Sequence, residues 1–325
     1  MGGRRSLIYT RSVMAPDCWL STMALAVDPI HLAHSFQSTR LAAVGSATIL
    51  LYDHLITIDQ EIDLVWRKDW SLLKGVFIFH RYLGLACVLI ELYAILNTNV
   101  SQSVSTFWFH WEMWAYTVVV LTTELVLLLW IFVIYNRNVQ ILAALGVLFV
   151  AEMVSVIVIL AQSFPRLRIT ATYAPVDSGL HNFCSLFNPP DFFYWYWLPV
   201  LIYNTAILAL FIGKSAKAFR VLHTPEINVV DSLYRRSLVN FLAIFAVFFL
   251  CCMFWIVGDF SLGQIPVGFA LSFSITNSTR LLINIRHAYY SQEEMDLDRP
   301  SAPTIYANQA PPEEWLFELR ALKLR

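Results

Sequence analysis

Four ionisable side chains lie inside segments that are otherwise apolar: Asp53, Arg81, Glu124 and Glu152. A charged side chain at the centre of a lipid bilayer costs at least about 2.5 to 3.5 kcal/mol, so such residues normally have a partner or a function. Acid and base can form a buried ion pair, and two close carboxyl groups in a low dielectric share one proton, as in proton relays and cation sites. These are the two kinds of chemistry that the sequence offers.

The two glutamates are spaced so that they can meet. Glu124 and Glu152 lie 13 and 15 residues from Arg137, which falls in a short turn between two apolar segments. On adjacent antiparallel helices the two carboxyl groups would have comparable depth. Two interpretations are open: a proton-sharing pair, or two separately protonated glutamates that bond Ser or Thr on neighbouring helices.

The aspartate and the arginine are also matched in depth. Asp53 and Arg81 each lie 14 positions from Arg67, near the next turn. At a rise of about 1.5 Å per residue they reach the same level on antiparallel neighbours, which predicts a buried ion pair between the first two helices. The pair would be structural, or alternatively part of a conformational switch.

Histidines beside this pair raise the question of a metal site. His54 and His80 adjoin Asp53 and Arg81, and zinc takes imidazole and carboxylate ligands. Adjacent residues on a helix point about 100° apart, so Asp53 and His54 are poorly placed for one ion. Since the chain also lacks P-loop, GxSxG and HExxH motifs, we expect no enzyme, metal or cofactor, with an intramembrane metal hydrolase as the disfavoured alternative.

The elements that must position these residues are membrane-spanning helices. Of the 325 residues, 58% are hydrophobic and only 14% are charged, against about 25% charged in globular proteins. Apolar runs of about 20 residues match the length of a helix that crosses a bilayer. The sequence therefore predicts an all-α integral membrane bundle of seven transmembrane helices, at 41–61, 73–96, 114–135, 139–161, 193–213, 235–257 and 264–286.

Basic residues predict how the chain is threaded. With the N-terminus outside and the C-terminus inside, 14 of the 22 Lys and Arg residues fall on the inner side and six on the outer side. This orientation divides the chain into an outer N-terminal segment 1–39, a transmembrane domain 40–290 and a cytoplasmic tail 291–325. Within the tail, 313–325 has the pattern of a short amphipathic helix.

Two features on the predicted outer side suggest modification. Asn99 begins an Asn-Val-Ser sequon in an outer loop and would be accessible to glycosylation, although sequons are frequent by chance. Cys18 and Cys184 both lie outside, where an oxidising environment would allow a disulfide.

The first two spans and the end of the last one carry a specific pattern. It comprises Tyr52, Asp53, Glu61, Trp66, Arg81, Tyr82, Arg280, Asn284 and Arg286. This pattern resembles a family of fungal seven-transmembrane proteins, abundant in basidiomycetes, that opens with a domain of unknown function. The resemblance is strongest over about 45–90 and implies an architecture, whereas no activity is established for the family.

The function is expected to be that of a receptor-like protein. A small ligand or lipid would be sensed in the outer half of the bundle, and the basic inner loop 214–236 would contact a cytoplasmic signalling protein, or only anionic lipid. The alternatives are a proton- or cation-coupled transporter that uses the intramembrane carboxylates, and a membrane scaffold protein.

The expected location is the plasma membrane or an endomembrane. A formal net charge of −1 argues against a nucleic-acid partner. The oligomeric state stays open.

Overall fold

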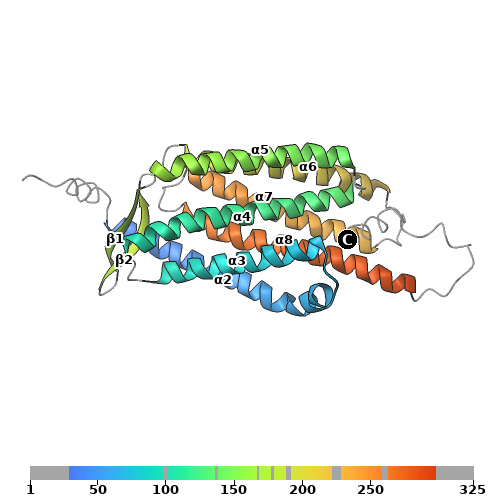
Figure 1. The fold of residues 1–325 in the computed structure, drawn as a ribbon, viewed down its shortest axis with the longest axis horizontal. Helices are drawn as coiled ribbons and strands as arrows, with labels where there is room; N and C mark the ends of the chain where they lie inside the picture. Colours follow the sequence, from blue (N-terminus) through green and yellow to red (C-terminus); the bar gives the residue numbers. More distant parts are fainter. Residues whose placement is uncertain are drawn as a thin grey trace, which may run out of the picture.

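A computed structural model of the chain contains a bundle of long helices (Figure 1). It describes residues 29–97, 101–135, 138–166, 168–176, 179–187, 192–221, 228–257 and 263–297. The long helices of these residues are α2 (Pro29–Glu61), α3 (Leu72–Leu96), α4 (Gln102–Ile134), α5 (Val139–Ser163), α6 (Trp197–Val221), α7 (Asn228–Val257) and α8 (Gln264–Leu297). A π-helical turn, Ile62–Trp66, continues α2, and short 3-10 turns occur at Phe164–Arg166 and Phe193–Tyr196.

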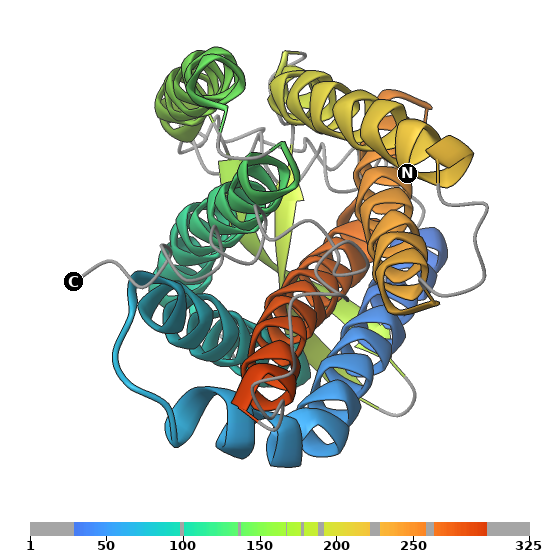
Figure 2. The ribbon, with the colours of Figure 1, turned by 90° about the vertical axis from the view of Figure 1, so that its right-hand side faces the viewer.

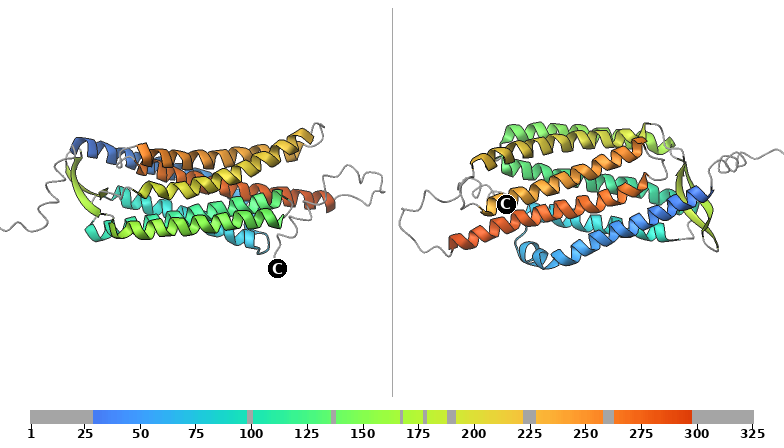
Figure 3. Two further views of the ribbon diagram at one scale, coloured as in Figure 1. Left: turned by 90° about the horizontal axis from the view of Figure 1, so that it is seen from above. Right: turned by 180° about the vertical axis from the view of Figure 1, so that it is seen from behind.

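Six of the helices, α2 to α7, are long and apolar enough to cross a membrane. The helix α8 is not among them because its middle carries Asn277, Thr279 and Arg280. It nevertheless runs beside α2 and α7 along the bundle (Figure 3) and also contacts α3 and α4. Its buried polar side chains are mostly small, as is common where transmembrane helices approach one another closely.

Several helices extend beyond the apolar runs from which they were predicted. The helix α4 begins at Gln102 and not at 114, and α8 continues to Leu297 and not to 286. An apolar run marks the part of a helix suited to lipid, whereas caps decide where the helix begins. Thus the Ser101 hydroxyl accepts a hydrogen bond from the Val104 amide at 3.4 Å at the start of α4.

The connection between α5 and α6 forms a β-hairpin that the sequence analysis did not predict. Strand β1 (Arg168–Val176) pairs antiparallel with β2 (Gly179–Phe187), with Arg168 opposite Phe187. The hairpin lies across one end of the bundle, next to the first turns of α2 and α4 (Figure 1). The predicted loop 162–192 is therefore largely a strand pair.

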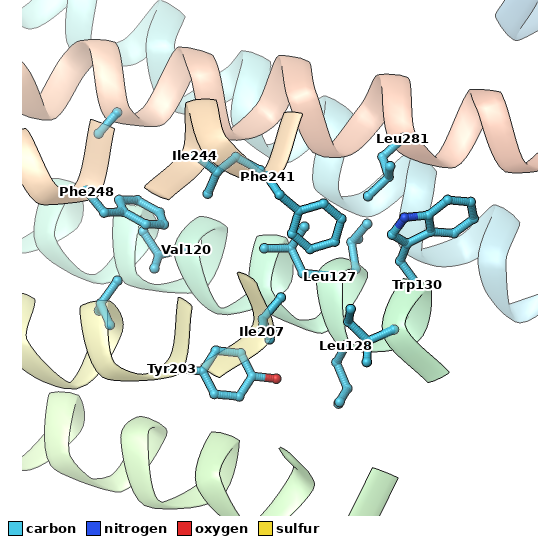
Figure 4. Packing of buried hydrophobic residues seen from close by; sticks show 14 of the residues in the cluster. Val120, Leu127, Leu128, Trp130, Tyr203, Ile207, Phe241, Ile244, Phe248 and Leu281 are labelled. Carbon is cyan, nitrogen blue, oxygen red and sulfur yellow. The ribbon is translucent and has the colours of Figure 1, made fainter. Parts of the chain in front are cut away.

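Aromatic and aliphatic side chains fill the centre of the bundle around α4. Seen along its length, the bundle has α4 and α8 near the middle (Figure 2). Leu127 of α4 packs with Ile207 of α6 and Phe241 of α7 (Figure 4). Phe241 also stacks on Phe211, with ring centroids 4.6 Å apart. Because lipid is as apolar as these side chains, close van der Waals packing stabilises the interior.

The helices α3 and α8 approach each other closely at a glycine. A Cβ atom added to Gly84 would lie only 2.3 Å from Cδ1 of Ile275. Only a residue without a side chain leaves room for this contact, so Gly84 sets the distance between α3 and α8.

Candidate functional site

A buried ionic cluster joins α2, α3 and α8. Asp53, which is only 2% exposed, lies at its centre. Its Oδ1 accepts a hydrogen bond from Nε of Arg280 at 2.6 Å, whereas its Oδ2 lies 3.8 Å from the Arg81 guanidinium. Asp53 and Arg81 therefore do lie together, as their spacing indicated, but the shortest contact of Asp53 is with the seventh predicted helix.

Arg81 has its own closer carboxylate. Its Nε lies 2.8 Å from Oε2 of Glu61, whose side chain is completely buried. The same guanidinium donates to Nδ1 of His54 at 3.0 Å and to the hydroxyl of Thr57 at 2.7 Å. Two carboxylates thus balance two arginines, and charge compensation of this kind is what makes buried ions tolerable.

Glu61 connects the cluster to an aromatic pair. Its Oε1 accepts from the Tyr82 hydroxyl at 2.8 Å and from Nε1 of Trp66 at 3.0 Å. The rings of Trp66 and Tyr82 meet edge to face, with centroids 6.1 Å apart. Tyr52, another predicted pattern residue, has 64% of its surface exposed.

A second set of contacts closes the turn between α2 and α3. Arg286 of α8 donates to the Leu64 carbonyl at 2.7 Å and to the Ser71 hydroxyl at 2.9 Å. Nζ of Lys74 donates to the carbonyls of Lys68 at 2.8 Å and Trp66 at 3.3 Å. These bonds satisfy carbonyl groups at the end of a helix, which otherwise lack partners. The helix α8 thus holds both the ionic cluster and the turn.

The predicted acidic pair lies between α4, α5 and α6. Glu124 and Glu152 are both buried, and their carboxyl groups are close enough to interact. Asn204 of α6 donates to Oε1 of Glu124 at 2.8 Å, but Oε2 of Glu124 and both oxygens of Glu152 receive no donor from the described residues. A proton held between the two carboxyl groups would supply the missing donor.

A pocket lies at the end of the bundle that carries the hairpin, and we call it the hairpin-end pocket. It has a volume of about 590 Å³, including its open mouth. It is bounded by residues 112–120 in the first half and middle of α4, by the turn before α6 and the start of α6, by the first turns of α8, and by the last turns of α5 and α7. Its wall contains the buried acid Glu112. Tyr116, in the same wall, donates a hydrogen bond to a further buried acid, Glu91.

Sequence reasoning did not single out Glu91 and Glu112. Glu91 lies within the apolar run 73–96, and an acid inside an apolar run would have been enough to mark it as a candidate site residue. Glu112 lies two residues before the predicted third span, outside the apolar run, next to Trp111. Because α4 begins a dozen residues earlier than that span, Glu112 belongs to the buried face of the helix.

The remaining predicted sites have different outcomes. His80, considered as a metal ligand, instead bonds the hydroxyls of Ser278 at 2.6 Å and Thr122 at 2.8 Å. Within the described ranges no group of three or more His, Cys, Asp or Glu is placed to hold a metal ion. Cys18, Asn99, the side chain of Cys184 and the tail 313–325 lie outside the residues that the structure describes.

The segment that contains most of the buried ionic cluster matches a known protein family. Residues 41–86 match DUF6533, a family of unknown function. The match runs from α2 into α3 and includes Asp53, Glu61 and Arg81. No curated protein matches the chain. The protein is thus a multi-pass, membrane-type helical protein that contains a domain of unknown function.

Proposed function

We propose that this protein is a receptor-like membrane protein of seven spans that binds a small ligand in the hairpin-end pocket. One observation carries the proposal: α8 forms part of the pocket and part of the ionic cluster. Val267 and Leu271 line the pocket, while Arg280 and Arg286 bind α2 and the turn after it. A ligand that displaces the start of α8 would therefore act on both arginine contacts.

The distance between the two sites suits a rigid lever. Thirteen residues separate Val267 from Arg280, which corresponds to about 20 Å along a helix. A helix is stiff over this length, and Asp53 already lies between two arginines, Arg280 and Arg81. A small displacement of α8 would exchange one pairing for another and alter the inner ends of α2 and α3.

The proposed orientation has the hairpin end outside and the turn after α2 inside. The distribution of basic residues supports it, with the N-terminus outside and the C-terminus inside. Lys74 and Arg286 lie at the proposed inner end, next to the turn. The segment 214–236 was predicted as an inner loop, but the structure shows its described residues as the end of α6 and the start of α7. This segment would then carry the signal to a cytoplasmic protein.

Filling the pocket with a side chain tests this coupling without knowledge of the ligand. Val267→Trp in the full chain, reconstituted in lipid nanodiscs, should change amide hydrogen exchange over 62–74, at the opposite end of the bundle. The matched control is Val257→Trp, because Val257 lies at the same end but is 75% exposed. Exchange that changes only around residue 267 would contradict the receptor proposal.

The buried acidic pair favours a second candidate, a proton- or cation-coupled transporter. Glu124 and Glu152 lie together in the interior, and three of their four carboxyl oxygens receive no donor from the described residues. Carboxyl groups of this kind mark proton pathways in membranes. The transporter predicts proton flux into liposomes that Glu124→Gln abolishes and that Asp63→Asn, at an exposed carboxylate, leaves unchanged.

A further inference from the structure

We propose that the ligand of the hairpin-end pocket is a small organic cation, an amine or a quaternary ammonium compound, and that Glu112 is its counter-ion. This inference rests on the proposed function, because it names the class of ligand for the same pocket. It is drawn from Glu112 and the aromatic rings that line the pocket, and from Glu91, which accepts a hydrogen bond from one of those rings.

Glu112 is a buried acid that has no basic partner among the residues that the structure describes. Its side chain is only 5% exposed, and its Oε2 receives no hydrogen bond from the described residues. Among the described residues, the charged group that acts on it is another acid, Glu91. A buried carboxylate in this position is costly unless a positive charge or a proton reaches it.

The second acid makes this end of the bundle still more attractive to a cation. Glu91 is buried and accepts a hydrogen bond from the hydroxyl of Tyr116, whose side chain lines the pocket. Among the described residues that line the pocket there is no Lys, Arg or His. Among these residues no side chain balances the charge of the acids, whereas a proton or a bound cation would do so.

Aromatic rings form much of the remaining wall. Tyr116, Tyr196, Trp197 and Trp255 come from α4, the turn before α6, α6 itself and α7. The rings of Tyr196 and Trp197 meet edge to face at 5.1 Å, and Thr117 lies 3.1 Å from the Tyr196 hydroxyl, which holds that ring in place. Ring faces attract cations, and sites lined by several aromatic rings recognise quaternary ammonium groups.

A neutral, purely apolar ligand suits this wall less well. It would fill the space between the rings but would cover Glu112 without offering a charge or a donor. An organic cation satisfies the acid with its charge and the rings with its alkyl or aryl groups. The wall of one acid and four rings therefore favours an organic cation over a neutral apolar ligand.

The test is equilibrium binding of tritiated phenyltrimethylammonium to the full chain in nanodiscs. Its neutral isostere, tert-butylbenzene, serves as the competitor. We expect saturable binding at one site and poor competition by the isostere. Glu112→Gln should weaken binding at least about tenfold, and Glu112→Asp, which keeps the charge, should weaken it less. Asp63→Asn removes an exposed carboxylate elsewhere and should have no effect.

A second pair of variants tests the rings separately from the acid. Trp255→Phe keeps an aromatic face and should preserve most of the binding, whereas Trp255→Leu should lose it in part. Thermal unfolding of each variant shows that it is folded. No saturable binding up to millimolar concentration, equal competition by the isostere, or unchanged affinity in Glu112→Gln would each overturn the inference.

The outcomes separate this inference from the proposed function. If the cation binds, but neither the cation nor Val267→Trp changes hydrogen exchange over 62–74, the cation site would be supported and the receptor proposal contradicted. Exchange that responds to Val267→Trp, with no cation binding, would support the coupling and contradict the cation site.

Discussion

Arg280 donates a hydrogen bond to Asp53 at 2.6 Å across 227 positions of the sequence. This contact fastens the last helix of the bundle to the first. It also leaves Oδ2 of Asp53 3.8 Å from Arg81, so that one carboxylate lies between two arginines. The relative strengths of these contacts lead to the first prediction.

Double-mutant cycles should rank the partners of Asp53. Asp53→Asn should lower the free energy of unfolding by about 2 kcal/mol, since it removes a buried charge from a balanced cluster. The coupling with Arg280→Gln should be about 1 kcal/mol, because Arg280 is 45% exposed and solvent screens the pair. The coupling with Arg81→Gln should be smaller at the longer distance. Thermal unfolding of the single and double variants in detergent measures both coupling energies. A coupling energy larger for Asp53–Arg81 than for Asp53–Arg280 would contradict the prediction.

Glu61 should matter far more than the nearby Asp63. Glu61→Gln leaves the buried Arg81 guanidinium without its closest carboxylate and should destabilise the fold by about 3 kcal/mol. Asp63 pairs with Arg67 at 2.7 Å, but both side chains are more than half exposed. Asp63→Asn should therefore cost less than about 0.5 kcal/mol. If Glu61→Gln and Asp63→Asn had the same unfolding midpoint, the ion pair between Glu61 and Arg81 would not stabilise the fold.

Gly84 should tolerate no side chain. Gly84→Ala forces a methyl group against Ile275 and should destabilise the protein by about 1 to 3 kcal/mol. Gly75→Ala in the same helix meets no atom within 4 Å and should be neutral or stabilising. Adding Ile275→Ala to Gly84→Ala should recover part of the loss. Equal unfolding midpoints for the two glycine variants would disprove the close contact between α3 and α8.

The acidic pair should be visible by infrared spectroscopy. If Glu124 and Glu152 share a proton, Glu124→Gln removes the partner of Glu152 and should shift the remaining carboxyl band. Asp63→Asn, which changes an exposed carboxylate, should leave that band in place. A Glu152 band that is the same with and without Glu124 would mean that the two groups do not interact.

Topology can be tested on intact cells. A tag at the N-terminus should bind antibody without permeabilisation, and a tag at the C-terminus should bind only after it, because most Lys and Arg residues lie on the proposed inner side. A C-terminal tag accessible on intact cells would refute the orientation or the seventh span.

Composition and spacing by themselves determined that the chain forms long membrane-type helices. Counting residues from a turn also placed Asp53 level with Arg81 and Glu124 level with Glu152, because helical rise is constant. Depth is encoded in this way, whereas the rotation of each helix about its axis is not.

Only the tertiary structure decided which residues meet at each level. Packing of α8 between α2 and α7 brings Arg280 to Asp53, and packing of α6 beside α4 brings Asn204 to Glu124. The hairpin-end pocket depends in the same way on residues from five helices, so no single segment reveals that Glu112 lines it. Contacts of this kind follow from how helices rotate and pack against one another, which depends on side chains distributed along the whole chain.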